Sequence, residues 1–215
     1  MEAVILTKSR MNSHGVSGVC TTAYDLESGT ILRFVSNQEG APIGNPHNSI
    51  YECLDVVEVN ILKGCPIGPQ TENVLVDQTS FKKVGKYTGD LSELFDEIYD
   101  IYCFDRQYMF DIPEAFSYKL DSVDRFNHSI EIIRVSDLVL TRSEWGSTSA
   151  SFFATTQNGK RSFRYYTVTD TRFELRNSPE SEKKIGNAYI VVSIPYTPYE
   201  KDGCFYKFVA AIYPI

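Results

Sequence analysis

The sequence contains few of the residues that build metal sites and disulfide frameworks. Its 215 residues include five cysteines and three histidines. The cysteines are odd in number, no two have CxxC spacing, and no HExxH motif occurs. Structural zinc sites and disulfide-rich domains depend on such spacings. We therefore expect no metal site and no disulfide framework, and free cysteines are typical of a cytoplasmic protein.

Long apolar segments and the short motifs of common enzyme classes are also missing. No run of 18 apolar residues occurs, whereas a membrane-spanning helix needs about 20. The N-terminal apolar stretch has no basic leader and no cleavage site for a signal peptidase. The sequence also lacks GxSxG, GxxxxGK[ST] and GxGxxG. We expect a protein without membrane partner, cofactor or catalytic activity.

Acidic residues outnumber basic residues, but the excess of negative charge is unevenly distributed along the chain. The formal net charge is −7, which by itself opposes binding to phosphate groups. Residues 90–124 contain ten acidic and two basic residues, so this stretch holds the whole excess. The remainder is nearly neutral, and residues 138–178 are mildly basic. Local nucleic-acid contacts therefore stay possible outside the acidic middle.

The first 85 residues predict a set of short β-strands. Five stretches rich in β-branched and aromatic residues are separated by turn-forming residues, as in Asp25 to Gly29. Residues 37–49 contain two prolines and two glycines without periodicity, so we expect a surface loop there. The expected strands cover residues 3–8, 16–23, 30–35, 55–62 and 72–77.

A helical period begins at Asp90. Asp90 and Glu93 fit a capping box, and Leu91, Leu94 and Phe95 begin an apolar stripe. We expect a helix over residues 90–102, and a second short helix that starts at Pro113.

The β pattern returns after residue 129. Asn158-Gly159 lies between two aromatic runs and predicts a hairpin. Residues 169–176 predict one helical turn capped by Thr169 or Asp170. About ten short strands with little helix are typical of small barrels or sandwiches.

Several blocks together resemble the bacterial dual OB-fold domain family. They are ILTKSR, DLESGTILRFVS, LDVVEVNILKGCPIGPQTENVLVD, FKKVGK, YTVTDTRFELR and CFYKFVAAIYP, which span about residues 3–213. The resemblance implies two OB-like units and an association with bacterial genome-defence systems. We therefore expect a mainly β protein of two small barrels joined by an acidic helical segment. The expected parts are a first OB-like domain over 1–89, a connector over 90–128 and a second OB-like domain over 129–215.

The best candidate for nucleic-acid binding is the stretch from Lys160 to Tyr166. OB barrels that bind single strands combine stacking aromatic residues with basic residues. Strict alternation along a strand places Arg161, Phe163 and Tyr165 on one face and Arg164 and Tyr166 on the other. Only one of these faces can meet a ligand, and the other packs in the barrel. Arg161, Arg164 and Tyr166 are thus candidates.

Further basic candidates are scattered along the chain. Lys8 and Arg10 lie at the end of the first expected strand. Arg33 lies in the expected strand over residues 30–35, which follows the hairpin turn at Asp25 to Gly29. Lys207 is flanked by aromatic residues, so it either snorkels to a surface or pairs with an acid such as Asp170. The full set of candidates is Lys8, Arg10, Arg33, Arg161, Arg164, Tyr166, Arg172 and Lys207.

A polar cluster at residues 70–73 has two interpretations. Gln70 and Asn73 follow a Pro-Gly loop, and their side chains can anchor that loop to the backbone. Their amides could equally recognise the edge of a base or another ligand.

Three functional hypotheses follow. The first is a non-enzymatic accessory module that binds nucleic acid, with single strands favoured, in a bacterial genome-defence or DNA-handling system. The second is an assembly subunit that docks a partner enzyme of such a system through its acidic segment. The third is a sensor of a nucleotide-like ligand held between the two barrels.

Overall fold

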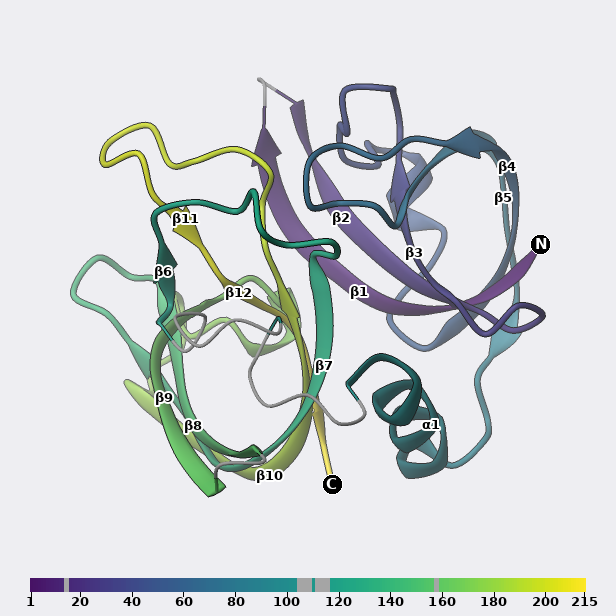
Figure 1. The fold of residues 1–215 in the computed structure, drawn as a ribbon. Helices are drawn as coiled ribbons and strands as arrows, with labels where there is room; N and C mark the ends of the chain where they lie inside the picture. Colours follow the sequence, from purple (N-terminus) through teal and green to yellow (C-terminus); the bar gives the residue numbers. More distant parts are fainter. Residues whose placement is uncertain (14–15, 104–109, 111–116, 157–158) are drawn as a thin grey trace. The chain divides into compact units, whose positions relative to one another are not determined.

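The computed structural model describes residues 1–13, 16–103, 110, 117–156 and 159–215. It divides into two compact units, Met1–Gly89 and Asp90–Ile215, and each contains a closed five-stranded barrel (Figure 1). The expectation of a mainly β protein with two small barrels is confirmed. The structure groups residues 90–128 with the second barrel, so their role as a separate connector stays a prediction.

The first barrel has the strand order β1-β2-β3-β5-β4 and is closed by pairing between β1 and β4. Neighbouring strands are antiparallel except β3 and β5, which are parallel. All five strands occur where the sequence predicts them. They are β1 (Glu2–Ser13), β2 (Val16–Asp25), β3 (Ile31–Val35), β4 (Asp55–Gly64) and β5 (Asn73–Lys86).

Alternating side chains fill the first barrel. Ala23 of β2, Phe34 of β3 and Val57 of β4 belong to one buried apolar cluster. The ring of Phe81 lies 5.8 Å from that of Phe34 and 5.1 Å from that of Tyr51. Side chains one position away point to the outer face of the same strands.

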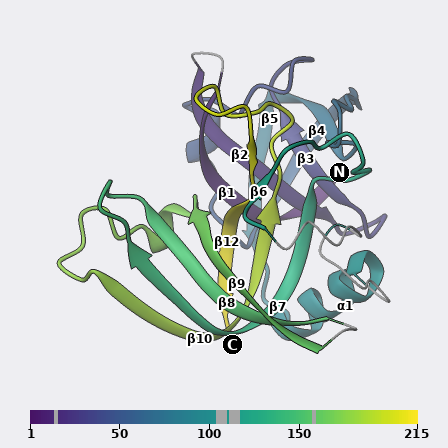
Figure 2. The ribbon, with the colours of Figure 1, turned by 60° about the vertical axis from the view of Figure 1, so that its left-hand side comes forward.

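The second barrel repeats this order as β7-β8-β9-β12-β10 and is closed by pairing between β7 and β10 (Figure 2). Its third and fifth strands, β9 and β12, are again the parallel pair. Both units thus match the five-stranded Greek-key barrel of the OB fold. The strands are β7 (Ile130–Arg142), β8 (Thr148–Thr156), β9 (Gly159–Val168), β10 (Glu182–Ser193) and β12 (Phe208–Pro214).

The predicted helix is present as α1 (Leu91–Cys103). Asp90 caps it, because its carboxylate accepts a hydrogen bond from the Ser92 amide at 2.7 Å. The apolar stripe packs within the second unit, where the Phe95 ring lies 5.2 Å from Tyr189 and 4.6 Å from Tyr213.

Two other local predictions have different outcomes. Most of the second predicted helix lies outside the described residues, and the described residues that follow form β6 (Lys119–Leu120), paired with β11 (Phe205–Tyr206). The predicted helical turn is confirmed as η4 (Thr171–Phe173), which is capped by the Asp170 side chain.

The expectation of a surface loop over residues 37–49 is wrong for its centre. The segment, which includes η1 (His47–Ser49), contains buried Ile43, paired with Val19 by two backbone hydrogen bonds of 3.1 Å. A side chain at Gly18 would place its Cβ 2.6 Å from the Ile43 carbonyl oxygen, so the close approach requires glycine. The apolar side chain of Ile43 belongs to the core of the first barrel, which explains its burial.

Within the described part of the chain, no helix combines the length and the apolar character needed to cross a membrane.

Candidate nucleic-acid interface

The outer face of β8 and β9 exposes aromatic and basic side chains of the second barrel. Phe152 and Phe163 face the core, where their rings stack at 5.2 Å. Phe153, one position along β8, is 36% exposed. The Lys160 ammonium lies 4.7 Å from the centre of the Phe153 ring. These two strands therefore present cations and an aromatic ring to solvent.

The prediction that side chains alternate strictly along β9 is wrong. Phe163 pairs with Phe152 and Tyr166 pairs with Ala150, so two residues of β9 lie opposite one residue of β8. The extra residue forms a β-bulge in which Tyr165 has a φ of +68°. Because of the bulge, both Phe163 and Tyr166 enter the core, while Arg164 and Tyr165 are exposed.

Tyr165 begins a row of four aromatic rings, which we call the tyrosine row. Its ring lies 6.1 Å from that of Tyr118, the Tyr118 ring lies 6.1 Å from Tyr206, and the Tyr206 ring lies 5.9 Å from Tyr199. The residues come from β9, the segment before β6, β11 and the connection between β10 and β11. Tyr165 is 63% and Tyr199 50% exposed, and the other two rings are half-buried.

A carboxylate that touches the tyrosine row, Asp202, is neutralised locally. Asp202 accepts a hydrogen bond from the Tyr206 hydroxyl at 2.6 Å and pairs with the Lys119 ammonium at 2.8 Å. The hydrogen bonds from Lys119 and Tyr206 lower the pKa of Asp202 to about 2. Lys119 also lies 5.7 Å from the centre of the Tyr206 ring. These contacts hold the Tyr206 ring in place.

Two predicted residues, Arg161 and Arg164, are exposed on β9. No carboxylate of the described residues pairs with Arg164, which is next to Tyr165 in sequence. A phosphate group could therefore bind Arg164 without displacing an existing ion pair. The binding roles of Arg161 and Arg164 stay predictions.

Two other predicted residues, Tyr166 and Lys207, are buried in the barrel. The Lys207 ammonium lies 5.6 Å from the centre of the Tyr166 ring. Burial lowers the pKa of Lys207 to about 7, against the opposing influence of Glu131. The Lys207 amide donates to the Tyr118 carbonyl at 3.0 Å, and the Tyr166 hydroxyl donates to the Ser117 carbonyl at 3.3 Å. Both residues thus position the segment that carries Tyr118, and their side chains lie in the barrel rather than on a ligand-binding surface.

Arg172 has a structural partner. It makes a bidentate contact to the buried carboxylate of Asp170, with distances of 3.0 and 2.8 Å, and lies 4.9 Å from the centre of the Tyr213 ring. Asp170 also accepts from the Ile212 amide at 2.9 Å. Arg172 therefore joins the connection after β9 to β12.

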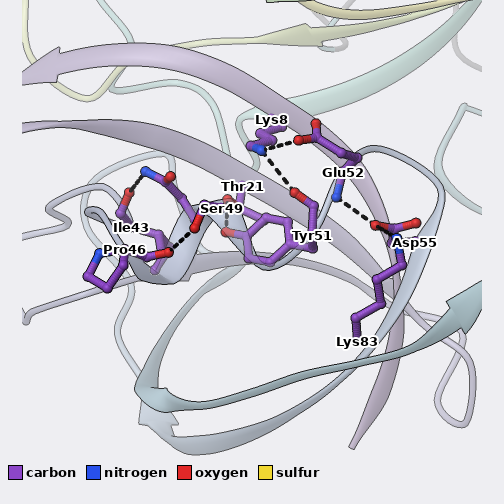
Figure 3. A network of polar contacts seen from close by, with 10 residues as sticks. Lys8, Thr21, Ile43, Pro46, Ser49, Tyr51, Glu52, Asp55 and Lys83 are labelled. Atoms are coloured by element: carbon purple, nitrogen blue, oxygen red, sulfur yellow. Dashed lines mark hydrogen bonds and ion pairs between the residues drawn. The ribbon is translucent and has the colours of Figure 1, made fainter.

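In the first barrel, Lys8 belongs to a network of polar contacts (Figure 3). Its ammonium donates to the Tyr51 carbonyl at 2.9 Å and to the Glu52 carboxylate at 2.7 Å. The Glu52 amide donates to Asp55, which also pairs with Lys83 at 2.6 Å. Lys8 thus ties the segment before β4 to β1, whereas Arg10 is exposed at the far part of β1.

The remaining predicted residues of the first barrel are buried. Arg33 is 5% exposed, and its guanidinium contacts the Cys20 sulfur at 3.1 Å and the Glu72 carboxylate at 3.3 Å. The Asn73 amide donates to the Gln70 side chain at 3.1 Å. These contacts favour the anchoring interpretation of Gln70 and Asn73 over the recognition of a ligand.

Sequence reasoning missed four exposed or half-exposed aromatic residues outside the ten barrel strands: Tyr118, Tyr199, Tyr206 and Trp145. Trp145 is 91% exposed in the turn between β7 and β8. A lone tryptophan among serine and glycine residues was a signal for an exposed ring. The three tyrosines had no such local signal, because the tertiary structure brings their segments together.

The described residues include no group of three or more His, Cys, Asp or Glu side chains placed to hold a metal ion. The absence of a cofactor stays a prediction.

Comparison with known proteins adds one match. The model of a family described as a dual OB-containing domain matches residues 1–212. No curated protein matches the chain.

Proposed function

The chain belongs to the dual OB-containing domain family, and from this premise we propose that its second barrel binds single-stranded nucleic acid. It would do so as a non-enzymatic accessory module. The association with bacterial genome-defence systems that the family resemblance implies suggests that setting, and a DNA-handling system is the alternative setting.

The observation that carries this proposal is the tyrosine row beside β9. OB folds bind oligonucleotides with their second and third strands and with the loops after the first and fourth strands. In the second barrel, the second and third strands are β8 and β9, and the loop after the fourth strand carries Tyr199 and leads to Tyr206. Tyr165, Tyr199 and Tyr206 of the row thus lie on or beside the elements that other OB folds use to bind oligonucleotides, which supports the proposal.

The chemistry of the surface favours single strands over duplexes. Stacking of a base on an aromatic side chain contributes about 1–3 kcal/mol and needs an exposed base face, which a duplex does not offer. Arg161 and Arg164 supply positive charge for the backbone on the same strand as Tyr165. Stacking tolerates any base, so we expect little sequence preference.

The equivalent face of the first barrel, on β2 and β3, has fewer exposed side chains that could contact nucleic acid. Thr22 of β2 and Arg33 of β3 lie one position from the core residues Ala23 and Phe34, so they point outward, yet both are buried. The Arg33 guanidinium already contacts Glu72. This difference favours the second barrel as the binding unit.

The test is fluorescence anisotropy with labelled single-stranded and duplex DNA and RNA, titrated with the whole protein at several salt concentrations. Tyr165→Ala and Tyr199→Ala each remove one exposed ring. We expect each to weaken single-strand binding by about 5- to 150-fold, the equivalent of one stacked base. Tyr165→Phe is the matched control, because it keeps the ring and loses only the hydroxyl.

Binding of single strands that falls with salt, is lost on alanine substitution and is kept in Tyr165→Phe would support the proposal. Absence of binding to every oligomer at low salt would overturn it. Strand binding that both alanine variants retain would overturn the role of the tyrosine row.

A further inference from the structure

A second surface feature of the second barrel is a hollow of about 580 Å³ between α1 and the outer faces of β7, β8 and β10. This volume lies within the ~300–1,000 Å³ of small-molecule sites. The residues that give it chemical character are Asp96, Arg134, Ser136, Phe153, Thr155 and Asn187.

The pairing of β7 with β8 fixes how these side chains face one another. Val135 pairs with Ala154, and both belong to the core. Arg134 and Phe153, each one position away, therefore lie on the outer face as diagonal neighbours. Diagonal neighbours on an antiparallel pair are about 7–8 Å apart, a span that a nucleoside monophosphate bridges between its base and its phosphate.

The aromatic component of the hollow is Phe153. Its ring is 36% exposed, although it is one of the apolar side chains that a barrel normally buries. The Lys160 ammonium lies over this ring at 4.7 Å and pairs with Asp137 at 3.0 Å. The ring thus has a cation over one face, and its exposed part offers a stacking surface for a base.

The charged component is Arg134. Its guanidinium lies 5.9 Å from the centre of the Tyr189 ring, and the described residues include no carboxylate that pairs with it. Asp96 on α1 accepts a hydrogen bond from the Tyr189 hydroxyl, which orients its carboxylate at the edge of the hollow. Arg134 can therefore receive an anion, while Asp96 can accept a hydrogen bond from a base.

We propose that this hollow binds a nucleoside phosphate, with the base on Phe153 and the phosphate on Arg134. Ser136, Thr155 and Asn187 supply hydrogen bonds to the sugar and the base edge. The ligand has two sources with the same chemistry: a free nucleotide, or the terminal nucleotide of a strand that is bound along the tyrosine row.

The first arm of the test is isothermal titration calorimetry of the whole protein with AMP, GMP, CMP, UMP and inorganic phosphate. Phe153→Leu keeps an apolar side chain and removes the ring, and Arg134→Gln removes the charge. We expect each variant to weaken nucleotide binding by about tenfold or more. Arg176→Gln is the matched control, since it removes an exposed arginine that belongs neither to the hollow nor to the proposed strand-binding surface. Circular dichroism melting checks that each variant is folded.

The second arm distinguishes the two sources. Hexanucleotides with a 5′-phosphate, a 3′-phosphate or no terminal phosphate are compared by anisotropy, with the wild type and Arg134→Gln. A gain from one terminal phosphate that Arg134→Gln abolishes assigns the hollow to a strand end. Binding of free mononucleotides without any effect of a terminal phosphate assigns it to a free nucleotide.

The outcome is independent of the tyrosine row. Nucleotide binding that survives Tyr165→Ala would support the hollow even if no strand binds. The proposal is overturned if no mononucleotide binds at millimolar concentration and no terminal phosphate matters. Inorganic phosphate that binds as tightly as the nucleotides, unaffected by Phe153→Leu, would also overturn it.

Discussion

The salt dependence of binding can test whether Arg164 contacts a phosphate group. On a single strand, each phosphate neutralised by a basic side chain adds about 0.7 to the magnitude of the slope of log affinity against log salt. Arg164→Ala should therefore lower affinity for a single strand and reduce the magnitude of that slope by about 0.7. Anisotropy over a salt series measures both quantities. Lys63→Ala, at an exposed lysine of the first barrel, is the control. An unchanged slope in Arg164→Ala would remove this residue from the interface.

Lys207 makes stability depend on pH. Its pKa falls from the ordinary 10.5 to about 7 in the folded protein, because burial disfavours the charged ammonium. Between about pH 7 and pH 10 the unfolded chain holds a proton that the folded chain has lost, so stability rises with pH in this window. Below about pH 7 Lys207 is charged in both the folded and the unfolded state, so the folded protein is destabilised by the full free energy of burying the ammonium group.

Lys207→Met should therefore raise the free energy of unfolding more at pH 6 than at pH 9. Urea unfolding at the two pH values measures this, with the exposed Lys63→Met as control. The nearby Glu131, which accepts from the Phe110 amide at 2.8 Å and contacts His128 at 3.0 Å, opposes the shift. Equal changes at both pH values would show that Lys207 keeps its proton on folding.

At the scale of the element, α1 depends on its first residue. The Asp90 carboxylate accepts from the Ser92 amide, which has no partner in the helix itself. Asp90→Ala should lower stability by about 1 kcal/mol, and Asp90→Asn should restore most of it. Thermal unfolding followed by circular dichroism measures the difference. A loss of equal size in both variants would assign the effect to charge rather than to capping.

The strands, the hairpins and the cap of α1 were predictable because their signals are local. The face of Tyr166 was not predictable, because a bulge at Tyr165 breaks the period of two that sequence reasoning assumes. The tyrosine row was equally hidden, since Tyr118 and Tyr199 lie far from Tyr165 in the chain. Arg33, in β3, and Lys207, between β11 and β12, show the converse: a basic residue among apolar residues can be buried rather than in contact with a ligand.

At the scale of the whole molecule, the proposed function distinguishes the two units. Hydrogen–deuterium exchange measured with and without a saturating single-stranded oligomer should slow in β9 and in residues 195–207. Residues 1–89 should show no change of similar size, because the tyrosine row belongs wholly to the second unit. Protection that is strongest in the first unit would place the binding surface there. A protein partner for the acidic residues 90–124 stays a separate prediction.

The bulge at Tyr165 has a consequence for protein engineering. A tyrosine at positive φ costs roughly 1–2 kcal/mol that glycine would avoid. A stability-guided redesign of β9 would therefore choose glycine or asparagine at this position and gain a higher melting temperature. The redesigned protein would lose the exposed ring that begins the tyrosine row. Thermostability is thus the wrong criterion for selecting variants at residue 165, and libraries that sample it need a binding screen.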